Sequence, residues 1–392
     1  MIETMSKPKR ILFLLAIFLT NIAACGELII TPITYNIYEA FPGQTMACNF
    51  IISAPMLIMI VVSLIVPKII NILGKKNTLL LGTILFTASG ILTVAINSIP
   101  FIICMRIINA IGQAIVNVDA MTLIADAYPD DQKRGTITGY YSAFMGLLSA
   151  VLSAISGSLA AISWTNAFFT YWAGVPMIIL VFLCIPYMND TKEEVQNTET
   201  KSHESYGRKF IIYCITLALF FICYCIPVYF GSVYIQENAL GNEAFSGLVS
   251  SVCSIAGMLA GLGFGFIYSK SKKYTGFISY LLLAIVLLLL YIKASAALLM
   301  ICMFVAGFVM NLVYSFGFSY ALTLVPESKT SGAIAILQAV SGCGQFAATY
   351  VVTFLMGILN TDLVKPILII PAVVAIIIAL VEFVCRKSER TN

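Results

Sequence analysis

Three ionisable residues, Glu27, Arg106 and Asp119, lie within long apolar stretches of the first half of the chain. Burying such a group among apolar side chains costs free energy, so each is a candidate for a function. Glu27 precedes Pro32, and at 3.6 residues per turn Thr31 lies on the same helical face as Glu27. A carboxylate on such a polar stripe can take up and release a proton.

Arg106 begins a second polar stripe, which Asn109, Gln113 and Asn117 continue at intervals of three or four residues. We expect the two stripes to line one aqueous cavity and to offer polar contacts to a ligand. An ion pair between Glu27 and Arg106 would lower the cost of burying either charge. It would also make the proton affinity of the carboxylate depend on the solvation of the cavity. The alternative is a structural pair that holds two helices together.

Asp119 and Asp126 fit this cavity less well. Asp119 lies about 140° from Arg106 on a helical wheel, at ~100° per residue, so it does not share the polar stripe. A transport role and a helix-packing role both remain open for Asp119. Asp126 lies close enough to the end of its apolar stretch to reach the membrane interface.

The apolar composition of the chain indicates an integral membrane protein. Hydrophobic residues make up 60% of the chain and charged residues 10%. Hydrocarbon accommodates that much apolar surface when every backbone polar group is bonded internally, which favours helices. A spanning helix needs roughly 20 apolar residues. The sequence predicts an all-α fold with twelve such helices, at 11–36, 46–66, 77–97, 100–124, 135–162, 165–187, 209–232, 245–268, 275–293, 296–325, 331–358 and 364–385.

The distribution of Lys and Arg predicts the orientation of these helices. With the N-terminus in the cytoplasm, only Lys293 and Lys365 of the 22 basic residues face outward, and Arg106 lies within the membrane. We therefore expect a multi-pass protein of the cell membrane with both termini in the cytoplasm. The net charge of +4 reflects this topology and does not indicate nucleic-acid binding, because the basic residues are spread over separate loops.

Cysteine and histidine give no sign of a metal site, a disulfide framework or a cofactor. Nearly all of the 11 cysteines lie in apolar spans, and the one histidine, His203, has no neighbouring Cys or His. An enzyme in the membrane would need a nucleophile or a metal cluster, and neither is evident. The segment that ends at Cys25 is similar to a lipoprotein signal, but we interpret it as the first transmembrane helix. A membrane receptor that transports nothing remains an alternative.

The chain repeats itself once. Lys75 and Lys76 recur as Lys272 and Lys273, and Pro129 recurs as Pro326, at a constant offset (272 − 75 and 326 − 129 both equal 197). One repeat in a lipid-soluble chain predicts two similar six-helix bundles with a substrate site between them, which is the organisation of a secondary transporter. The predicted parts are an N-terminal bundle (1–187), a flexible linker (188–208) and a C-terminal bundle (209–392).

The second half replaces the ionisable residues with neutral polar and aromatic ones. The repeat aligns Glu27 with Tyr224 and Asn117 with Tyr314, and Asn311 lies one helical turn before Tyr314. We expect proton exchange in the first half and apolar, aromatic substrate contact in the second. Aromatic packing and interfacial anchoring are the alternative for any single tyrosine.

The predicted cytoplasmic loops carry a recognisable motif. The loop after the second span contains Asn71, Gly74, Lys75 and Lys76, and Asp126 lies at the end of the fourth span. This loop resembles a motif of the major facilitator superfamily, as does Arg106 with Gly112 six residues on. Together with twelve spans in two halves, these motifs make the chain resemble that family over essentially its whole length. The family usually has an acid where Asn71 stands. The resemblance implies a gate at these residues, and we expect Lys75 to pair with Asp126 when the cavity opens outward.

The resemblance implies a monomeric secondary transporter of a small molecule that works by alternating access in a lipid bilayer. Glu27 with Arg106 is similar to the acid and arginine of proton-coupled drug antiporters, so we expect proton-coupled efflux of an amphipathic or lipophilic compound. Residues 149–157 have Ser and Ala where family efflux pumps have a Gly- and Pro-rich motif. This departure from the motif argues against antiport. Uptake or facilitated transport of a polar metabolite, such as a sugar or an organic acid, is the alternative.

Overall fold

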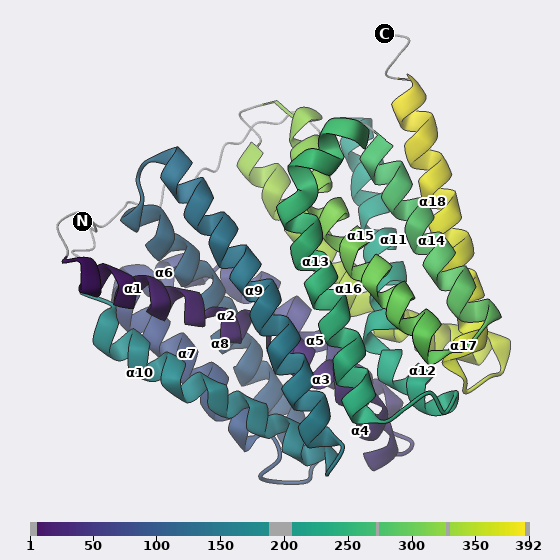
Figure 1. Ribbon diagram of the computed structural model, residues 1–392, viewed down its shortest axis with the longest axis horizontal. Coiled ribbons are helices and arrows are strands. Elements are labelled where there is room, and N and C mark those ends of the chain that lie inside the picture. Colours follow the sequence, from purple (N-terminus) through teal and green to yellow (C-terminus); the bar gives the residue numbers. More distant parts are fainter. Residues whose placement is uncertain (1–5, 188–205, 272–273, 327–329, 389–392) are drawn as a thin grey trace.

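The computed structural model of this chain describes residues 6–187, 206–271, 274–326 and 330–388, and it contains no strand within them (Figure 1). The first half forms α1 (Lys7–Leu19), α2 (Asn21–Ala24), α3 (Gly26–Ile30), η2 (Thr31–Ile33), α4 (Thr34–Ala40), α5 (Thr45–Ser63), α6 (Val66–Leu73), α7 (Lys75–Leu92), α8 (Ile99–Ala127), α9 (Asp131–Ala160), η3 (Trp164–Ala173) and α10 (Gly174–Cys184). The second half forms α11 (Arg208–Tyr229), α12 (Gly231–Glu237), α13 (Glu243–Ser271), α14 (Thr275–Ile292), α15 (Ala296–Thr323), α16 (Thr330–Leu359), α17 (Val364–Ile367) and α18 (Ile369–Ser388).

All twelve predicted spans coincide with helices. Among the described residues, ten helices are long and apolar enough to cross a membrane, and the bent pair 8–24 and 26–40 makes an eleventh span if it is counted as one. The third predicted span corresponds to α7, which starts with Lys75 and Lys76 and is not among these helices. The all-α membrane fold is thus confirmed, and a count of twelve is consistent with it.

The first span is broken where it carries Glu27. Its two parts meet at an angle of 48°. The Thr20 hydroxyl donates to the Ile17 carbonyl oxygen (2.5 Å), a bond that bends helices. Pro32 has no N–H to continue the ladder and lies in the short η2 helix. These breaks leave backbone carbonyl groups near Glu27 available to side chains of other helices.

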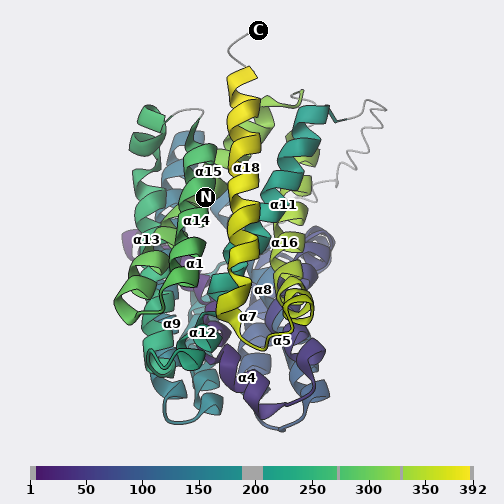
Figure 2. The same cartoon turned by 90° about the vertical axis from the view of Figure 1, so that its right-hand side faces the viewer.

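The two halves have separate hydrophobic cores, and Figure 1 shows them side by side. One buried cluster draws on residues between Phe13 and Ile185, and the other lies between Phe210 and Ala379 with Ile52 as its one first-half member. Figure 2 shows α18 along the second half, where it packs against α14 and α11. The predicted linker 188–208 lies mostly outside the described residues, as does His203, so the bundle boundaries stay a prediction.

The contacts between the halves follow the sequence repeat. Helix α9 packs against α13, and α5 packs against α16, which is the same pairing with the halves exchanged. The backbone N–H of Tyr35 donates to the Ser232 hydroxyl at 2.8 Å, and these two residues are 197 positions apart. A contact between equivalent positions is expected where two repeats meet at an axis of pseudo-symmetry.

Polar contacts between the halves gather at one end of the molecule. We call the end that carries α4 and α12 the outer end, and the opposite end, with Lys75 and Asp126, the inner end, following the predicted orientation. At the outer end, the Asn36 amide donates to Glu243 Oε1 (3.0 Å) and the Asn49 amide donates to Thr353 Oγ1 (2.8 Å). These hydrogen bonds join the halves there.

Candidate functional site

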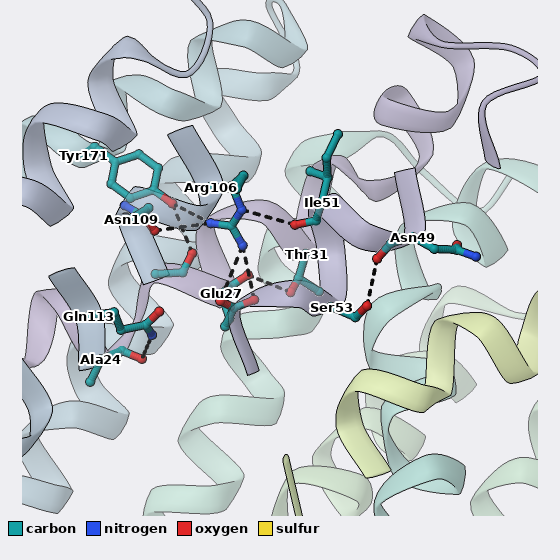
Figure 3. A network of polar contacts seen from close by, with 11 residues as sticks. Ala24, Glu27, Thr31, Asn49, Ile51, Ser53, Arg106, Asn109, Gln113 and Tyr171 are labelled. Atoms are coloured by element: carbon teal, nitrogen blue, oxygen red, sulfur yellow. Dashed lines mark hydrogen bonds and ion pairs between the residues drawn. The ribbon is translucent and has the colours of Figure 1, made fainter. Parts of the chain in front are cut away.

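Glu27 and Arg106 form an ion pair inside the first half (Figure 3). Arg106 Nη2 lies 3.3 Å from Glu27 Oε2 and 3.4 Å from Oε1, and the two side chains are 2% and 11% exposed. Glu27 comes from α3, just after the break in the first span, and Arg106 comes from α8. The predicted pairing of these two residues is therefore present, and its role in proton coupling stays a prediction.

The Arg106 guanidinium has further acceptors around it. Its Nε donates to the Ile51 carbonyl oxygen (3.2 Å), and its Nη1 donates to Asn109 Oδ1 and to the Tyr171 hydroxyl (both 3.3 Å). A guanidinium carries five donors in a rigid fork, so this set of acceptors from α5, α8 and η3 fixes its orientation. Arg106 can therefore keep its place when its bond to Glu27 changes.

A second layer of hydrogen bonds holds this arrangement. The Asn109 amide donates to the Phe86 carbonyl oxygen at 2.8 Å, and the Tyr171 hydroxyl donates to the Gly26 carbonyl oxygen at 3.4 Å. Tyr171 thus joins Arg106 to the backbone beside Glu27. Tyr171 could not be selected from the sequence, because it is one of several aromatic residues in an apolar run and no spacing connects it to Arg106.

Two further members of the predicted polar stripes, Thr31 and Gln113, bond to the backbone of the broken first span. The Thr31 hydroxyl donates to the Glu27 carbonyl oxygen (3.1 Å), and the Gln113 amide donates to the Ala24 carbonyl oxygen (3.4 Å). Gln113 Oε1 is buried and has no hydrogen-bond partner. Asn117 is half-buried in the same helix. The Thr31 hydroxyl and the Gln113 amide nitrogen therefore stabilise the irregular backbone around Glu27.

A cavity of about 700 Å³ lies between the halves, toward the inner end. Residues 135–149 of α9, 250–262 of α13 and 303–315 of α15 form most of its wall, and Leu28, Tyr224 and Val228 complete it. Tyr140 and Tyr314, which line it, are 61% and 43% exposed. The cavity therefore opens toward the inner end, while the outer end is closed by the contacts described above.

The cavity is lined by some of the predicted substrate-binding residues and not by others. Tyr224, Asn311 and Tyr314 line it. Thr31, Asn109, Gln113 and Asn117 do not. The last three belong to α8, which packs against α2, α5 and α7 and turns its polar face into the first half, and the Thr31 hydroxyl bonds to the backbone of Glu27.

We expected a site between the first, fourth, seventh and tenth spans; no residue of the fourth span lines this cavity, and the predicted substrate contacts stay a prediction. Sequence reasoning missed α9 and α13, since their cavity faces consist mainly of small residues with no charge. Asp119 is fully buried and does not line the cavity.

The predicted gate residues meet at the inner end. Lys75 Nζ lies 2.5 Å from Asp126 Oδ2, and the two side chains are 17% and 35% exposed. Gly74 has φ +77°, a left-handed conformation that favours glycine. Lys76 Nζ lies 4.5 Å from the centre of the Tyr187 ring, and Asn71 is exposed in α6.

The Lys75–Asp126 pair is present in a conformation other than the one in which we expected it. We expected the pair when the cavity opens outward, yet it is formed beside a cavity that opens toward the inner end. Both partners belong to the first half, so their bond does not require the two halves to approach each other. A gating role for these residues stays a prediction.

Comparison with known proteins shows which family the chain matches. The family model described as the Major Facilitator Superfamily matches residues 16–275 and 212–392. Multidrug resistance protein 3 of Bacillus subtilis (strain 168) is 30% identical over 129 residues, which are 32% of this chain and 24% of that protein. The uncharacterised MFS-type transporter EfpA of Mycobacterium tuberculosis (strain ATCC 25618 / H37Rv) is 25% identical over 31% of this chain and 23% of its own. The alignments thus span about a quarter of the length of these relatives.

Solved structures share the fold over nearly the whole chain. A bacterial homologue of the human lysosomal transporter Spinster, in an inward-facing and unoccupied conformation, has a TM-score of 0.77 at 12% identity and covers 97% of each chain. This chain has two helical halves with a cavity between them, and the family model covers it almost completely. The chain is a multi-pass membrane protein of the Major Facilitator Superfamily.

Proposed function

We propose that this transporter exports a small amphipathic or lipophilic compound in exchange for protons. The observation that carries the proposal is the buried Glu27–Arg106 pair at the break of the first span. Protonation of Glu27 would remove one charge of the pair and leave Arg106 with its neutral acceptors. Arg106 stays fixed by them, so the change falls on the short α3 segment that carries Glu27.

Glu27 is also placed to influence the second half. Leu28, the neighbour of Glu27 in sequence, lines the cavity between the halves. A proton on Glu27 can therefore change the surroundings of a bound compound and the contact between the halves. Differential stabilisation of two conformations is what couples one ligand to another.

The cavity wall supports an apolar or amphipathic cargo. Tyr224 and Tyr314 offer aromatic faces, and Asn311 offers one amide. The name of the Bacillus subtilis relative, multidrug resistance protein 3, is in keeping with such cargo. The Ser- and Ala-containing segment 149–157 still permits close contact between helices, since Gly157 of α9 lies against Gly247 of α13.

Vesicle transport tests the proposal directly. The purified protein would be inserted into liposomes, a pH gradient imposed, and the flux of a panel of lipophilic compounds measured with and without a protonophore. We expect uphill movement of at least one compound against the proton flux, abolished by the protonophore. Flux that is insensitive to the gradient would contradict proton coupling.

Proton-driven uptake of a polar metabolite is the second candidate. A D-xylose–proton symporter has the same fold, with a TM-score of 0.76 at 13% identity over 95% of this chain and 97% of its own, a likeness that concerns the fold alone. Serine hydroxyl groups and Asn311 in the cavity give it some support. Cotransport of a sugar and protons in the same direction would favour it, and the absence of any flux would favour a receptor.

A further inference from the structure

The cavity wall carries no charge. Among the described residues that line it there is no Asp, Glu, Lys, Arg or His. Glu27 and Arg106, the charged groups of the proposed coupling site, are buried and bonded to each other. Neither lines the cavity, although Leu28, the neighbour of Glu27 in sequence, does. A bound ion would therefore lose water without gaining an opposite charge, which is costly in surroundings of low dielectric constant.

Protonation of Glu27 makes the site less suitable for a cation. With Glu27 ionised, the Glu27–Arg106 pair has no net charge; with Glu27 protonated, Arg106 leaves a net positive charge. A cationic cargo would meet no attraction in the first state and repulsion in the second. An anion would be separated from Arg106, whose side chain is 2% exposed. The cavity thus offers no opposite charge to a cationic cargo or to an anionic one.

The chemical character of the wall is that of thioethers and aromatic rings. Met145 of α9, Met258 of α13, and Met303 and Met310 of α15 all line the cavity, so the thioethers come from three of its walls. Thioether sulfur atoms adapt to irregular ligands and make favourable contacts with aromatic rings. Tyr224 adds a rigid surface.

The orientation of Tyr224 is fixed on two sides. Its ring stacks on Phe220, with centroids 6.1 Å apart and an interplanar angle of 13°. Its hydroxyl lies 3.8 Å from the Cys253 sulfur. A ring held in this way presents one plane to the cavity, which suits a flat ligand.

The α9 wall of the cavity is open at two glycines. Gly135 and Gly139 lie one turn apart on α9, both line the cavity, and a Cβ at either position would meet no atom within 4 Å. The bare backbone there leaves room in the part of the cavity beside α9. Asn311 supplies a neutral amide for hydrogen bonding.

We propose that the cargo is an uncharged compound with a flat aromatic body, held between the methionine side chains and Tyr224 with its polar group toward Asn311. This inference rests on the proposed transport function for its biological meaning, but binding can be measured without a proton gradient. Its failure would leave the proton-coupling test unaffected.

Three matched probes distinguish the charge states. N-methylacridone is neutral, N-methylacridinium is a permanent cation with the same ring system, and acridone-N-acetate is an anion. We would measure their dissociation constants for the purified full-length protein at equilibrium. We expect N-methylacridone to bind at least about tenfold more tightly than either ion. Equal or tighter binding of an ion, or no binding of N-methylacridone, would overturn the proposal.

Two variants test the location of the probe. Gly139→Leu fills the open side of the cavity and should abolish binding of N-methylacridone, whereas Gly357→Leu, at an exposed glycine with open space outside the cavity, should leave it unchanged. Met310→Gln should weaken binding roughly two- to tenfold, as expected from the loss of sulfur–aromatic contact. Unfolding temperatures would show that each variant is folded. Wild-type affinity in Gly139→Leu would place the ligand elsewhere and refute the proposal.

Discussion

Arg106 uses its contacts to organise the first half rather than to face the cavity. Its acceptors come from α3, α5, α8 and η3, so a single side chain joins four elements around Glu27. The sequence predicted the pair because two ionisable residues in apolar spans need partners. It did not predict that Tyr171 would bond to Arg106, or that Asn109 would bond to Arg106 and Phe86 and not to a ligand. Those roles depend on how η3 and α7 approach α8.

At the residue scale, the Tyr171 hydroxyl should stabilise the network without touching the cargo. Tyr171→Phe removes its bonds to Arg106 and to the Gly26 carbonyl group, and a buried carbonyl group without its donor costs about 1–3 kcal/mol. We expect a lower unfolding temperature and an altered pH dependence of transport, with unchanged cargo affinity. Loss of cargo affinity at wild-type stability would instead place Tyr171 at the binding site.

Glu237 should make stability depend on pH. It accepts hydrogen bonds from the Val364 N–H at the outer end (2.9 and 3.1 Å), and burial raises the pKa of its carboxyl group from 4.5 to about 7. The folded chain therefore binds more protons than the unfolded chain between these values, so this contribution to stability is present at low pH and is lost as pH rises through 7.

The unfolding temperature should consequently fall between pH 5 and pH 8, and Glu237→Gln should reduce that fall. The exposed Glu39→Gln variant is the control and should keep the wild-type slope. Identical slopes for wild type and Glu237→Gln would contradict the assignment.

At the scale of elements, the spans were predictable and the cavity wall was not. Twenty apolar residues in a row can be stable in a bilayer only as a helix, so hydropathy placed the helices. The faces of α9 and α13 carry Gly, Ser and Met, for which apolar packing and ligand contact give the same pattern. Likewise α8 has a polar stripe of the expected spacing, but its packing against α7 and α5 decides that the stripe faces inward.

The connection between α4 and α13 should hold the outer end closed. Glu243 accepts from Asn36 across the halves (3.0 Å) and from Gln236 within the second half (3.3 Å). Glu243→Ala removes the cross-half bond, which at roughly 1 kcal/mol would shift the population about fivefold toward an open outer end. Spin-label distances across that end should lengthen, while Gln236→Ala should leave them unchanged. Unchanged distances in Glu243→Ala would rule out this role.

At the scale of the whole molecule, closure of the outer end depends on backbone contact between the halves. A Cβ at Gly157 of α9 would lie 2.6 Å from the Glu243 carbonyl oxygen and 2.6 Å from Gly247 Cα of α13. Backbone cannot move aside as a side chain can, so Gly157→Val should force the halves apart there. The two-half arrangement was readable from the repeat, but this contact needed the packed structure.

We expect Gly157→Val to abolish transport while the protein still inserts and folds, with longer distances between labels at the outer end. Gly265→Val is the matched control, since a Cβ there meets nothing within 4 Å. Wild-type transport by Gly157→Val would show that outer closure does not need this contact.

The central claim is that Glu27 carries the coupling proton, and the Glu27→Gln variant tests it most directly. In proteoliposomes, the variant should lose uphill transport driven by a pH gradient while it still exchanges labelled cargo for unlabelled cargo. Glu39→Gln, which changes an exposed acid at the end of the same span, should behave as wild type. Uphill transport by Glu27→Gln at the wild-type rate would contradict the account.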